Sequence, residues 1–360
     1  MRRVLLLTSP LSLRGSSLYT VSLARELKLR GHKVAVMGPG GILEGALEEQ
    51  DVPVLPAPVH GVFLRDALYL NLLGDLARDF DPEVLHVQSH AMAVIGSLLA
   101  LQLDVADVVT VHTQMAGPLR LPPGSRTHAI AVSEDVRQAL VTHGRFPRDR
   151  IDVIPNGVSA SLSALEEEPV QAGELPIVGT VSRLARGRGI EHFLQAARAV
   201  LDAGAKAHFL IVGEGPAERE LRRLARKLGL DEHLTFALPR ARISDLFRPI
   251  DVFVSVGESE GHGIFILTAM AEARPIVCTG VGGVLSVVRD GENGLLVARG
   301  DVEELASRIR GLLAAPEERK RLGRAALKGV REQFPLHPMI EETTATYERA
   351  IAAVAPAATE

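Results

Sequence analysis

The sequence contains one cysteine and no tryptophan among its 360 residues. The single cysteine, Cys278, excludes an internal disulfide framework, and it excludes any zinc site that needs several thiolates. The lack of tryptophan has no mechanistic consequence that we can draw. A chain with one thiol fits a reducing compartment, and its fold must rest on hydrophobic burial.

The sequence also lacks a long hydrophobic run and a surplus of positive charge. Its longest apolar segment, Ala91 to Leu101, is too short to span a bilayer. The apolar run Val4–Leu7 near the start is too short for a signal peptide, and Pro10 follows it closely. The net charge of −4 provides no general attraction for nucleic acid. We therefore expect a cytoplasmic protein with no nucleic-acid partner.

What is present is an alternation of short apolar runs with helix-length segments, in a chain long enough for two domains. The apolar runs are continuous rather than alternating, which favours parallel sheets that are covered on both faces. The predicted strands are Val4–Thr8, Lys33–Met37, Glu83–Val87, Val108–Val111, Ala129–Val132, Asp152–Ile154, Pro176–Val181, His208–Val212, Leu234–Ala237, Val252–Val256 and Pro275–Cys278. The predicted helices are Ser17–Arg30, Arg65–Arg78, Glu134–His143, Ile190–Leu201, Ala217–Leu228 and Val302–Leu313. The expected fold class is α/β, with two Rossmann-like domains.

The stretch GESEGHGI, residues 257–264, follows a predicted strand and precedes an apolar helix. Glycines at a helix start let a ligand approach the backbone, and the free N–H groups there favour a phosphate. The same letters contain Gly-x-Ser-x-Gly, the nucleophile elbow of serine hydrolases, and Asp290 and His337 follow Ser259 in the required order. No upstream oxyanion segment accompanies that pattern, so serine hydrolysis through Ser259 is kept as a minor alternative.

A second loop of this kind follows the strand that ends at Val181. Its segment SRLARGRG, residues 182–189, places Arg183 and Arg188 before a helix start. Guanidinium groups are permanent, multidentate donors, which a diphosphate requires. The sequence therefore predicts an anion-binding edge, although a solvated basic loop would carry the same residues.

Taken in order, several short motifs resemble a known family. They are RGHKV (30–34), VLH (84–86), VTVHT (109–113), AVSE (131–134), VIPNGV (153–158), SRL (182–184), VGEGP (212–216), EGHG (260–263), AMA (269–271), GG (282–283) and DGENGLLV (290–297). Each motif is weak alone, but the ordered series resembles the retaining glycosyltransferases of family 4, which have the GT-B fold.

This resemblance implies a domain plan and a reaction. Residues 1–158 would form an acceptor domain, 159–173 a linker, and 174–335 a domain that binds the nucleotide sugar. A last helix at about 337–356 would pack back onto the first domain. The implied enzyme moves a sugar from a UDP-, GDP- or ADP-sugar to a lipid, glycan or small molecule with retention. It needs neither a metal nor another cofactor, because cationic side chains and a helix N-terminus stabilise the leaving group.

The resemblance also assigns roles to individual residues. Arg183 and Arg188 would hold the donor diphosphate, which Gly15 and Ser16 would approach from the first domain. Glu260 would contact hydroxyls of the donor sugar, and His112 would orient that sugar near its anomeric carbon. The remaining donor-binding residues would be Gly261, His262, Gly263, Ile264 and Thr268.

The chain departs from the family pattern at several of these positions. Thr268 stands where a second glutamate usually binds the ribose hydroxyls, and a threonine cannot form the bidentate charged contact. Ser16 and Ala273 replace glycines, and Ser286 stands where glutamate is frequent. These changes leave a second interpretation open, in which the chain is a catalytically impaired relative that acts as a binding protein.

Two further pairs of residues each allow a simple structural interpretation beside a functional one. His86 and His90 have the spacing of a metal pair, but positions four apart in a strand are separated by roughly 13 Å. We therefore expect a packed or hydrogen-bonded His86. Arg120 and Arg126 could meet an anionic acceptor or the inner membrane surface, and solvated loop arginines are the simpler alternative. Ser133 is expected to cap a helix.

Overall fold

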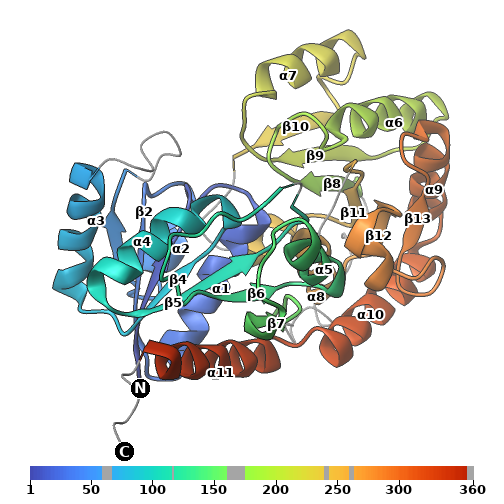
Figure 1. Cartoon of the computed structure of the whole chain (residues 1–360). Helices are drawn as coiled ribbons and strands as arrows, with labels where there is room; N and C mark the ends of the chain where they lie inside the picture. Colours follow the sequence, from blue (N-terminus) through green and yellow to red (C-terminus); the bar gives the residue numbers. More distant parts are fainter. Residues whose placement is uncertain (59–66, 116, 160–174, 239–242, 259–262, 355–360) are drawn as a thin grey trace, which may run out of the picture. The chain divides into compact units, whose positions relative to one another are not determined.

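The computed structural model describes residues 1–58, 67–115, 117–159, 175–238, 243–258 and 263–354. The chain forms two compact units, one made of Met1–Asn156 with Leu336–Glu360 and the other of Gly157–Pro335. Each unit has its own parallel β-sheet flanked by helices (Figure 1). The expected linker at 159–173 lies almost entirely outside the described residues.

The first unit contains a seven-stranded sheet in the order β3-β2-β1-β4-β5-β6-β7. Every pairing in it is parallel. Its strands are β1 (Arg3–Leu7), β2 (Lys33–Gly38), β3 (Val54–Pro56), β4 (Val84–Val87), β5 (Ala106–Val111), β6 (His128–Ala131) and β7 (Ile151–Val153). Its α-helices are α1 (Gly15–Leu29), α2 (Glu44–Glu48), α3 (Ala67–Phe80), α4 (Ala93–Leu103), α5 (Glu134–Thr142) and α11 (Leu336–Val354).

The second unit contains a six-stranded parallel sheet in the order β10-β9-β8-β11-β12-β13. Its strands are β8 (Ile177–Val181), β9 (His208–Val212), β10 (Leu234–Ala237), β11 (Val252–Ser255), β12 (Ile276–Thr279) and β13 (Leu295–Val297). Its α-helices are α6 (Ile190–Asp202), α7 (Glu218–Lys227), α8 (Ile264–Ala271), α9 (Val302–Ala314) and α10 (Pro316–Gln333). The α/β class with two parallel sheets is thus confirmed.

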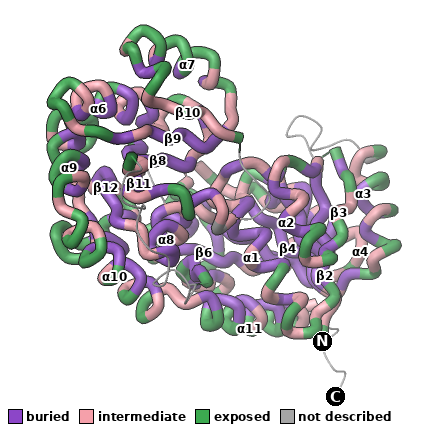
Figure 2. The backbone as a smooth tube through the Cα atoms, turned by 180° about the vertical axis from the view of Figure 1, so that it is seen from behind, coloured by how far each residue is buried: buried purple, intermediate pink, exposed green. Residues whose placement is uncertain are grey.

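The two faces of the first sheet are covered by different helices because successive side chains of a strand point to opposite faces. One face carries a buried cluster that includes Leu5, Leu85 and Val109, and side chains of α3, α4 and α5 complete this cluster. The other face carries His86, which contacts α11. Figure 2 shows the central strands of both sheets as mostly buried, while exposed segments lie mainly on the helices.

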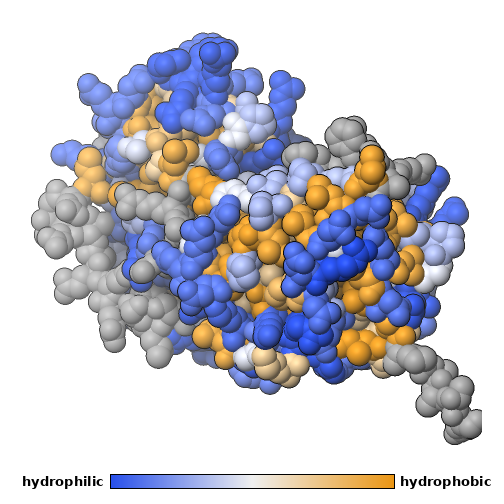
Figure 3. All heavy atoms as spheres, turned by 90° about the vertical axis from the view of Figure 1, so that its left-hand side faces the viewer, coloured by the Kyte–Doolittle hydropathy of each residue, from blue (hydrophilic) through white to orange (hydrophobic). Residues whose placement is uncertain are grey.

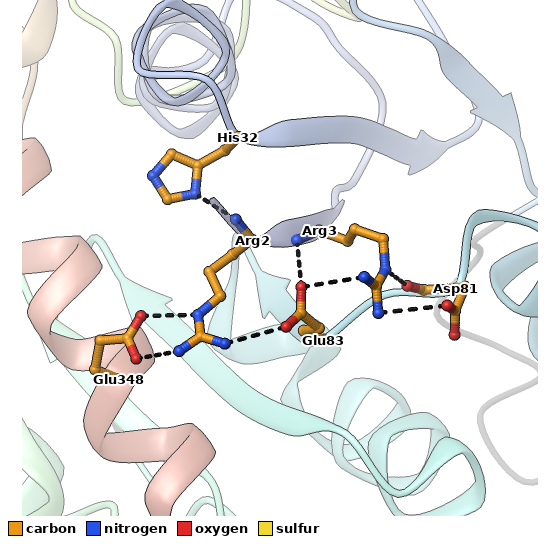
Figure 4. Close-up of polar contacts among 6 residues, drawn as sticks. All are labelled: Arg2, Arg3, His32, Asp81, Glu83 and Glu348. Atoms are coloured by element: carbon orange, nitrogen blue, oxygen red, sulfur yellow. Dashed lines mark hydrogen bonds and ion pairs between the residues drawn. The ribbon is translucent and has the colours of Figure 1, made fainter.

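Helix α11 is fixed to the first unit by polar contacts at several points along its length. Inside the core, His86 Nδ1 lies 2.7 Å from the hydroxyl of Tyr347. At the surface, the Arg2 guanidinium binds Glu83 at 3.1 Å and Glu348 at 2.5 Å (Figure 4). The backbone N–H groups of Arg2 and Arg3 donate to His32 and Glu83, so these contacts also fix the start of β1. The last helix therefore completes a unit that the first strand begins.

Strand order reverses once in each sheet. In the first unit the reversal lies between β1 and β4, and in the second it lies between β8 and β11. Ligands of open parallel sheets bind beyond the carboxyl ends of the strands at this reversal. The loops that follow β1 and β4, and those that follow β8 and β11, are therefore the places to look for a site.

No helix in the described ranges is both long enough and apolar enough to cross a bilayer. On the α3 side of the first unit, hydrophobic patches lie between hydrophilic atoms (Figure 3). Helix α3 contributes two exposed leucines, Leu68 and Leu72.

Candidate functional site

In the second unit, the loops after β8 and β11 are bonded to each other at the strand reversal. The backbone N–H of Glu258 donates to the carbonyl of Gly187 at 2.9 Å. Gly189 approaches β11 so closely that a Cβ there would lie 1.7 Å from the carbonyl oxygen of Val256. Only glycine permits this approach, and Gly189 also has a φ of +70°. The sequence thus brings the arginine loop and the loop after β11 into one place.

The position of Arg183 is set by its buried neighbour. Leu184 is fully buried, and its N–H and C=O bond Glu214 O and Ala217 N in the loop after β9. Arg183 is therefore held at the carboxyl edge of the sheet while remaining partly exposed. No ion pair is formed by Arg183 within the described part of the chain. Arg188 is also partly exposed and lies one residue before Gly189, which begins α6.

Helices α6 and α8 both begin at this edge with a left-handed glycine and without a side-chain cap. Gly189 is the N-cap of α6, and Gly263, with a φ of +49°, is the N-cap of α8. The first N–H groups of a helix have no partner within it, and those beginning at Ile264 have none among the described residues. By contrast, Ser133 caps α5, as expected, and Asp301 caps α9 through its side chain.

Thr268 lies on α8, one helical turn after Ile264. Its hydroxyl donates to the carbonyl of Ile264 at 2.7 Å. The hydroxyl proton is thus used within the helix, and only the lone pairs of the oxygen remain for a ligand. Ser259, Glu260, Gly261 and His262 lie outside the described residues, so the structure provides no geometry for them.

In the first unit, Gly15 and Ser16 form the first turn of α1, directly after the loop that follows β1. The prediction that this helix begins at Ser17 was therefore wrong by two residues. Helix α1 has no side-chain cap, because Arg14 occupies the N-cap position. Gly15 and Ser16 are partly exposed, as an approach to a ligand requires.

His112 follows the last residue of β5 at the same edge of the first sheet. Its ring makes an edge contact with Tyr19 of α1, with centroids 4.9 Å apart and an interplanar angle of 72°. Its Nε2 is buried and has no hydrogen-bond partner within the described residues. Burial, with a smaller contribution from His90, lowers the pKa of His112 to about 4. The imidazole is therefore neutral near pH 7 and can donate or accept one hydrogen bond through Nε2.

The histidine pair does not form a metal site. His86 is fully buried, and its two ring nitrogens lie 2.7 Å from the hydroxyls of Tyr347 and Thr110. The expectation of a hydrogen-bonded His86 is confirmed. No cluster of three metal-ligating side chains occurs in the part of the chain that the structure describes. Arg126 binds Asp104 at 3.1 Å and the carbonyl of Val354 at 3.0 Å, so it serves the first unit itself.

Two residues near these edges were missed by the reasoning from sequence. Arg299, after β13, forms an ion pair with Glu258 at 2.8 Å and supports the loop after β11. Gln88, directly after β4, is buried and has an amide oxygen with no partner in the described chain. A polar residue at the end of an apolar strand was a visible signal for Gln88. Nothing in the sequence paired Arg299 with Glu258.

Two family descriptions together match most of the chain. The family described as Glycosyltransferase Family 4 matches residues 13–162, and the one described as Glycosyl transferases group 1 matches residues 164–329. The boundary between the two matches falls close to the division between the two units.

The chain is also similar to characterised proteins and solved structures. It is 28% identical to D-inositol 3-phosphate glycosyltransferase of Nocardia farcinica, over 90% of this chain and 83% of that protein. It is 29% identical to 2-deoxystreptamine glucosyltransferase of Streptomyces kanamyceticus, over 82% and 78%. Among solved structures, Anabaena Alr3699/HepE in complex with UDP-glucose has a TM-score of 0.78 at 20% identity, covering 97% of this chain and 100% of that one. Both of these relatives are named as glycosyltransferases.

Proposed function

Because the chain belongs to glycosyltransferase family 4 and is a retaining glycosyltransferase that takes its sugar from a nucleotide-sugar donor, we propose that its second unit binds the donor diphosphate at the β8–α6 and β11–α8 loops. One observation carries this proposal. Two helix N-termini without side-chain caps lie at one strand reversal, and the loop between β8 and α6 carries Arg183 and Arg188. Permanent cations beside free N–H groups suit a diphosphate.

The proposed contacts within the second unit follow from these positions. Arg183 and Arg188 bind the diphosphate, and the N–H groups that begin at Ile264 bind its oxygens. Glu260 binds hydroxyls of the donor sugar, with the backbone of Gly261, His262 and Gly263 beside it. Thr268 accepts one hydrogen bond from the ribose, because its own proton is bound to Ile264.

Three residues of the first unit also have proposed roles. His112, with its pKa lowered by burial, orients the donor sugar through Nε2 without carrying a charge. Gly15 and Ser16 at the start of α1 approach the donor phosphates. The acceptor binds to this unit as well.

The proposed reaction is a front-face displacement with retention. The bond between the anomeric carbon and the diphosphate breaks while the acceptor oxygen forms its bond from the same side. The leaving diphosphate takes the acceptor proton, and the charge that develops on it is stabilised by Arg183, Arg188 and the N–H groups of α8. We propose that no metal takes part, since these groups suffice for the leaving charge.

The names of two relatives suggest the class of acceptor. One relative is named for D-inositol 3-phosphate and the other for 2-deoxystreptamine, and both of these are cyclohexane rings with several hydroxyl groups. The solved relative Alr3699/HepE contains UDP-glucose. We propose a UDP-sugar donor and a small polyhydroxylated acceptor for this chain.

Donor-dependent thermal stabilisation tests the proposal. A ligand present at about a hundred times its dissociation constant adds about 2.7 kcal/mol to the free energy of unfolding. We expect UDP-glucose to raise Tm in wild type and to raise it far less in Arg183→Ala. Arg186, on the same loop and exposed, provides the matched control, and Arg186→Ala should respond like wild type. If no UDP-, GDP- or ADP-sugar raises Tm of the wild type, the proposed donor site is wrong.

A further inference from the structure

Gln88 is a buried amide whose oxygen has no hydrogen-bond partner among the described residues. The residue is 1% exposed and directly follows β4. Its backbone N–H donates to Leu7 O at 2.9 Å, so the sheet pairing with β1 continues to this position. Its side-chain Nε2 donates to the carbonyl of His86 at 3.3 Å, and its Oε1 is unpaired within the described residues.

The orientation of this amide is determined by the same carbonyl. Turning the side chain over would place Oε1 against the carbonyl oxygen of His86, so two acceptors would face each other. An unpaired buried acceptor destabilises the folded state, and proteins rarely retain such a group without a partner. An amide oxygen fixed in this way points to a ligand that supplies the missing donor.

Gln88 shares its place in the fold with His112. Both directly follow neighbouring strands, β4 and β5, at the carboxyl edge of the first sheet. Alternation along β4 puts Gln88 on the face of His86, and alternation along β5 puts His112 on the face of Thr110. His86 and Thr110 are bonded to each other, so this is one face. Two unpaired buried polar atoms, Gln88 Oε1 and His112 Nε2, thus belong to one face at one edge.

We propose that Gln88 is an acceptor-binding residue, and that its amide oxygen accepts a hydrogen bond from a hydroxyl group of a neutral polyol acceptor. This inference rests on the proposed function, in which the first unit binds the acceptor. It adds a residue to that unit and a chemical requirement on what it binds.

The chemistry of an amide oxygen restricts what this position accepts. It is an acceptor without a proton, so it binds an O–H or N–H group and repels a phosphate or carboxylate oxygen. His112 is neutral near pH 7, and no described side chain donates a hydrogen bond to Gln88 Oε1. A phosphate group on an acceptor would therefore have to bind elsewhere, while a ring hydroxyl binds here.

The experiment uses the full chain saturated with UDP, and it uses myo-inositol and inorganic phosphate as probes in calorimetric titrations. Gln88→Leu replaces the amide with an apolar side chain of similar size. Gln102 is the matched control, because its buried amide oxygen is also unpaired but belongs to the end of α4 beside Asn71. We expect Gln88→Leu to weaken myo-inositol binding about tenfold and Gln102→Leu to leave it unchanged.

Measurements of Tm distinguish a binding role of Gln88 from a structural role in packing. Each leucine variant removes an unpaired buried acceptor, so its Tm should equal or exceed that of wild type. If Gln88→Leu fails to fold, Gln88→Met provides the same test with a more flexible side chain. A structural role for Gln88 predicts the reverse pattern, with lower Tm and unchanged myo-inositol binding.

The outcomes distinguish this inference from the proposed function. Equal binding of myo-inositol by wild type and Gln88→Leu overturns the inference, as does binding of inorganic phosphate that depends on Gln88. Failure of wild type to bind myo-inositol overturns it too, while an increase of Tm with UDP-glucose would leave the proposed function standing. A wild type that binds myo-inositol but no nucleotide sugar would overturn the donor site and leave the Gln88 contact intact.

Discussion

The two units share one topology but provide opposite environments at their carboxyl edges. At the edge of the first unit, His112 and Gln88 each hold a buried polar atom that has no hydrogen-bond partner among the described residues. The edge of the second unit is cationic and more exposed, with Arg183 and Arg188 beside two helix N-termini. In our proposal, Gln88 binds a hydroxyl group at the first edge, and Arg183 and Arg188 bind the diphosphate at the second, because the loops rather than the sheets carry the chemistry.

The two units also differ in the pKa values of their buried side chains. Burial lowers the pKa of His86 to about 3 and that of His112 to about 4, and it raises the pKa of Asp107 to about 6. All three residues lie in the first unit. In the described part of the second unit, His208 is the histidine whose pKa burial lowers. The first unit should therefore respond to acid more strongly than the second.

The largest expected effect comes from removing a positive charge from the edge of the second unit. Arg183→Ala should reduce kcat/KM for transfer by about 10²–10³, because it removes a cation from the leaving diphosphate. Binding of myo-inositol by the first unit should change little. Steady-state kinetics with UDP-glucose measure the first quantity and calorimetry the second. Arg183→Ala activity within threefold of wild type would contradict the assigned role, with Arg186→Ala as the control.

The next largest effect is expected when a substitution adds a negative charge to α8 in the second unit. Thr268→Glu should tighten UDP binding by roughly 10- to 150-fold, since a charge-assisted hydrogen bond contributes about 1.5–3 kcal/mol. Thr268→Gln has nearly the same shape without the charge and should gain much less. Equal UDP affinities for wild type and Thr268→Glu, measured by calorimetry, would show that α8 does not reach the ribose.

A third expected effect is the change in stability of the first unit as the pH falls. His86 and His112 have folded pKa values below the ordinary 6.5, so the stability they contribute is lost as pH falls below about 6.5. Asp107 acts in the opposite direction, since its raised pKa makes the folded state bind a proton between about pH 6 and 4. Over that pH range, Asp107 raises the stability of the folded state as the pH falls, while the two histidines lower it.

Asp107→Asn should therefore steepen the loss of stability near pH 5 by about 1.4 kcal/mol per pH unit. Hydrogen exchange of peptides from β4 and β5 measures this slope in the first unit, and peptides from β8 and β9 serve as the internal control. Identical slopes for wild type and Asp107→Asn would mean that Asp107 titrates normally.

The sequence predicted the sheets better than it predicted their surroundings. Strands β1 and β8 were visible because buried parallel strands are continuous apolar runs. Strand β3 has three residues and ends at Pro56, so its apolar signal was too short. Helix α10 was missed, although Pro316 at its start, two glutamates in its first turn and four buried apolar residues carry a helical pattern.

The site was less predictable for a physical reason. Residue types at a strand end indicated Arg183 and Arg188, because chemistry gathers at loops of this fold, while His112 was indicated by the family resemblance. The unpaired state of Gln88 depends on which neighbours fail to reach it, and only tertiary packing decides that. The pairing of Arg299 with Glu258 likewise joins loops that are 41 residues apart.

The smallest expected effect concerns the end of α8 in the second unit. Ala273 has a φ of +53°, a left-handed conformation that costs a non-glycine residue about 1–2 kcal/mol. Ala273→Gly should therefore raise the free energy of unfolding by about 1 kcal/mol, as measured by urea denaturation. Ala203→Gly, at the end of α6 where φ is −77°, should not stabilise. A lower Tm for Ala273→Gly would contradict this account.

The return of α11 to the first unit has a consequence for synthesis. Residues 157–335 form a continuous unit that can fold as soon as it leaves the ribosome. The other unit must wait, because His86 is fully buried and its partner Tyr347 follows the second unit in the chain. The first unit, whose synthesis begins before that of the second, is therefore completed after it, and a nascent chain acquires the loops after β8 and β11 before α11 packs onto His86.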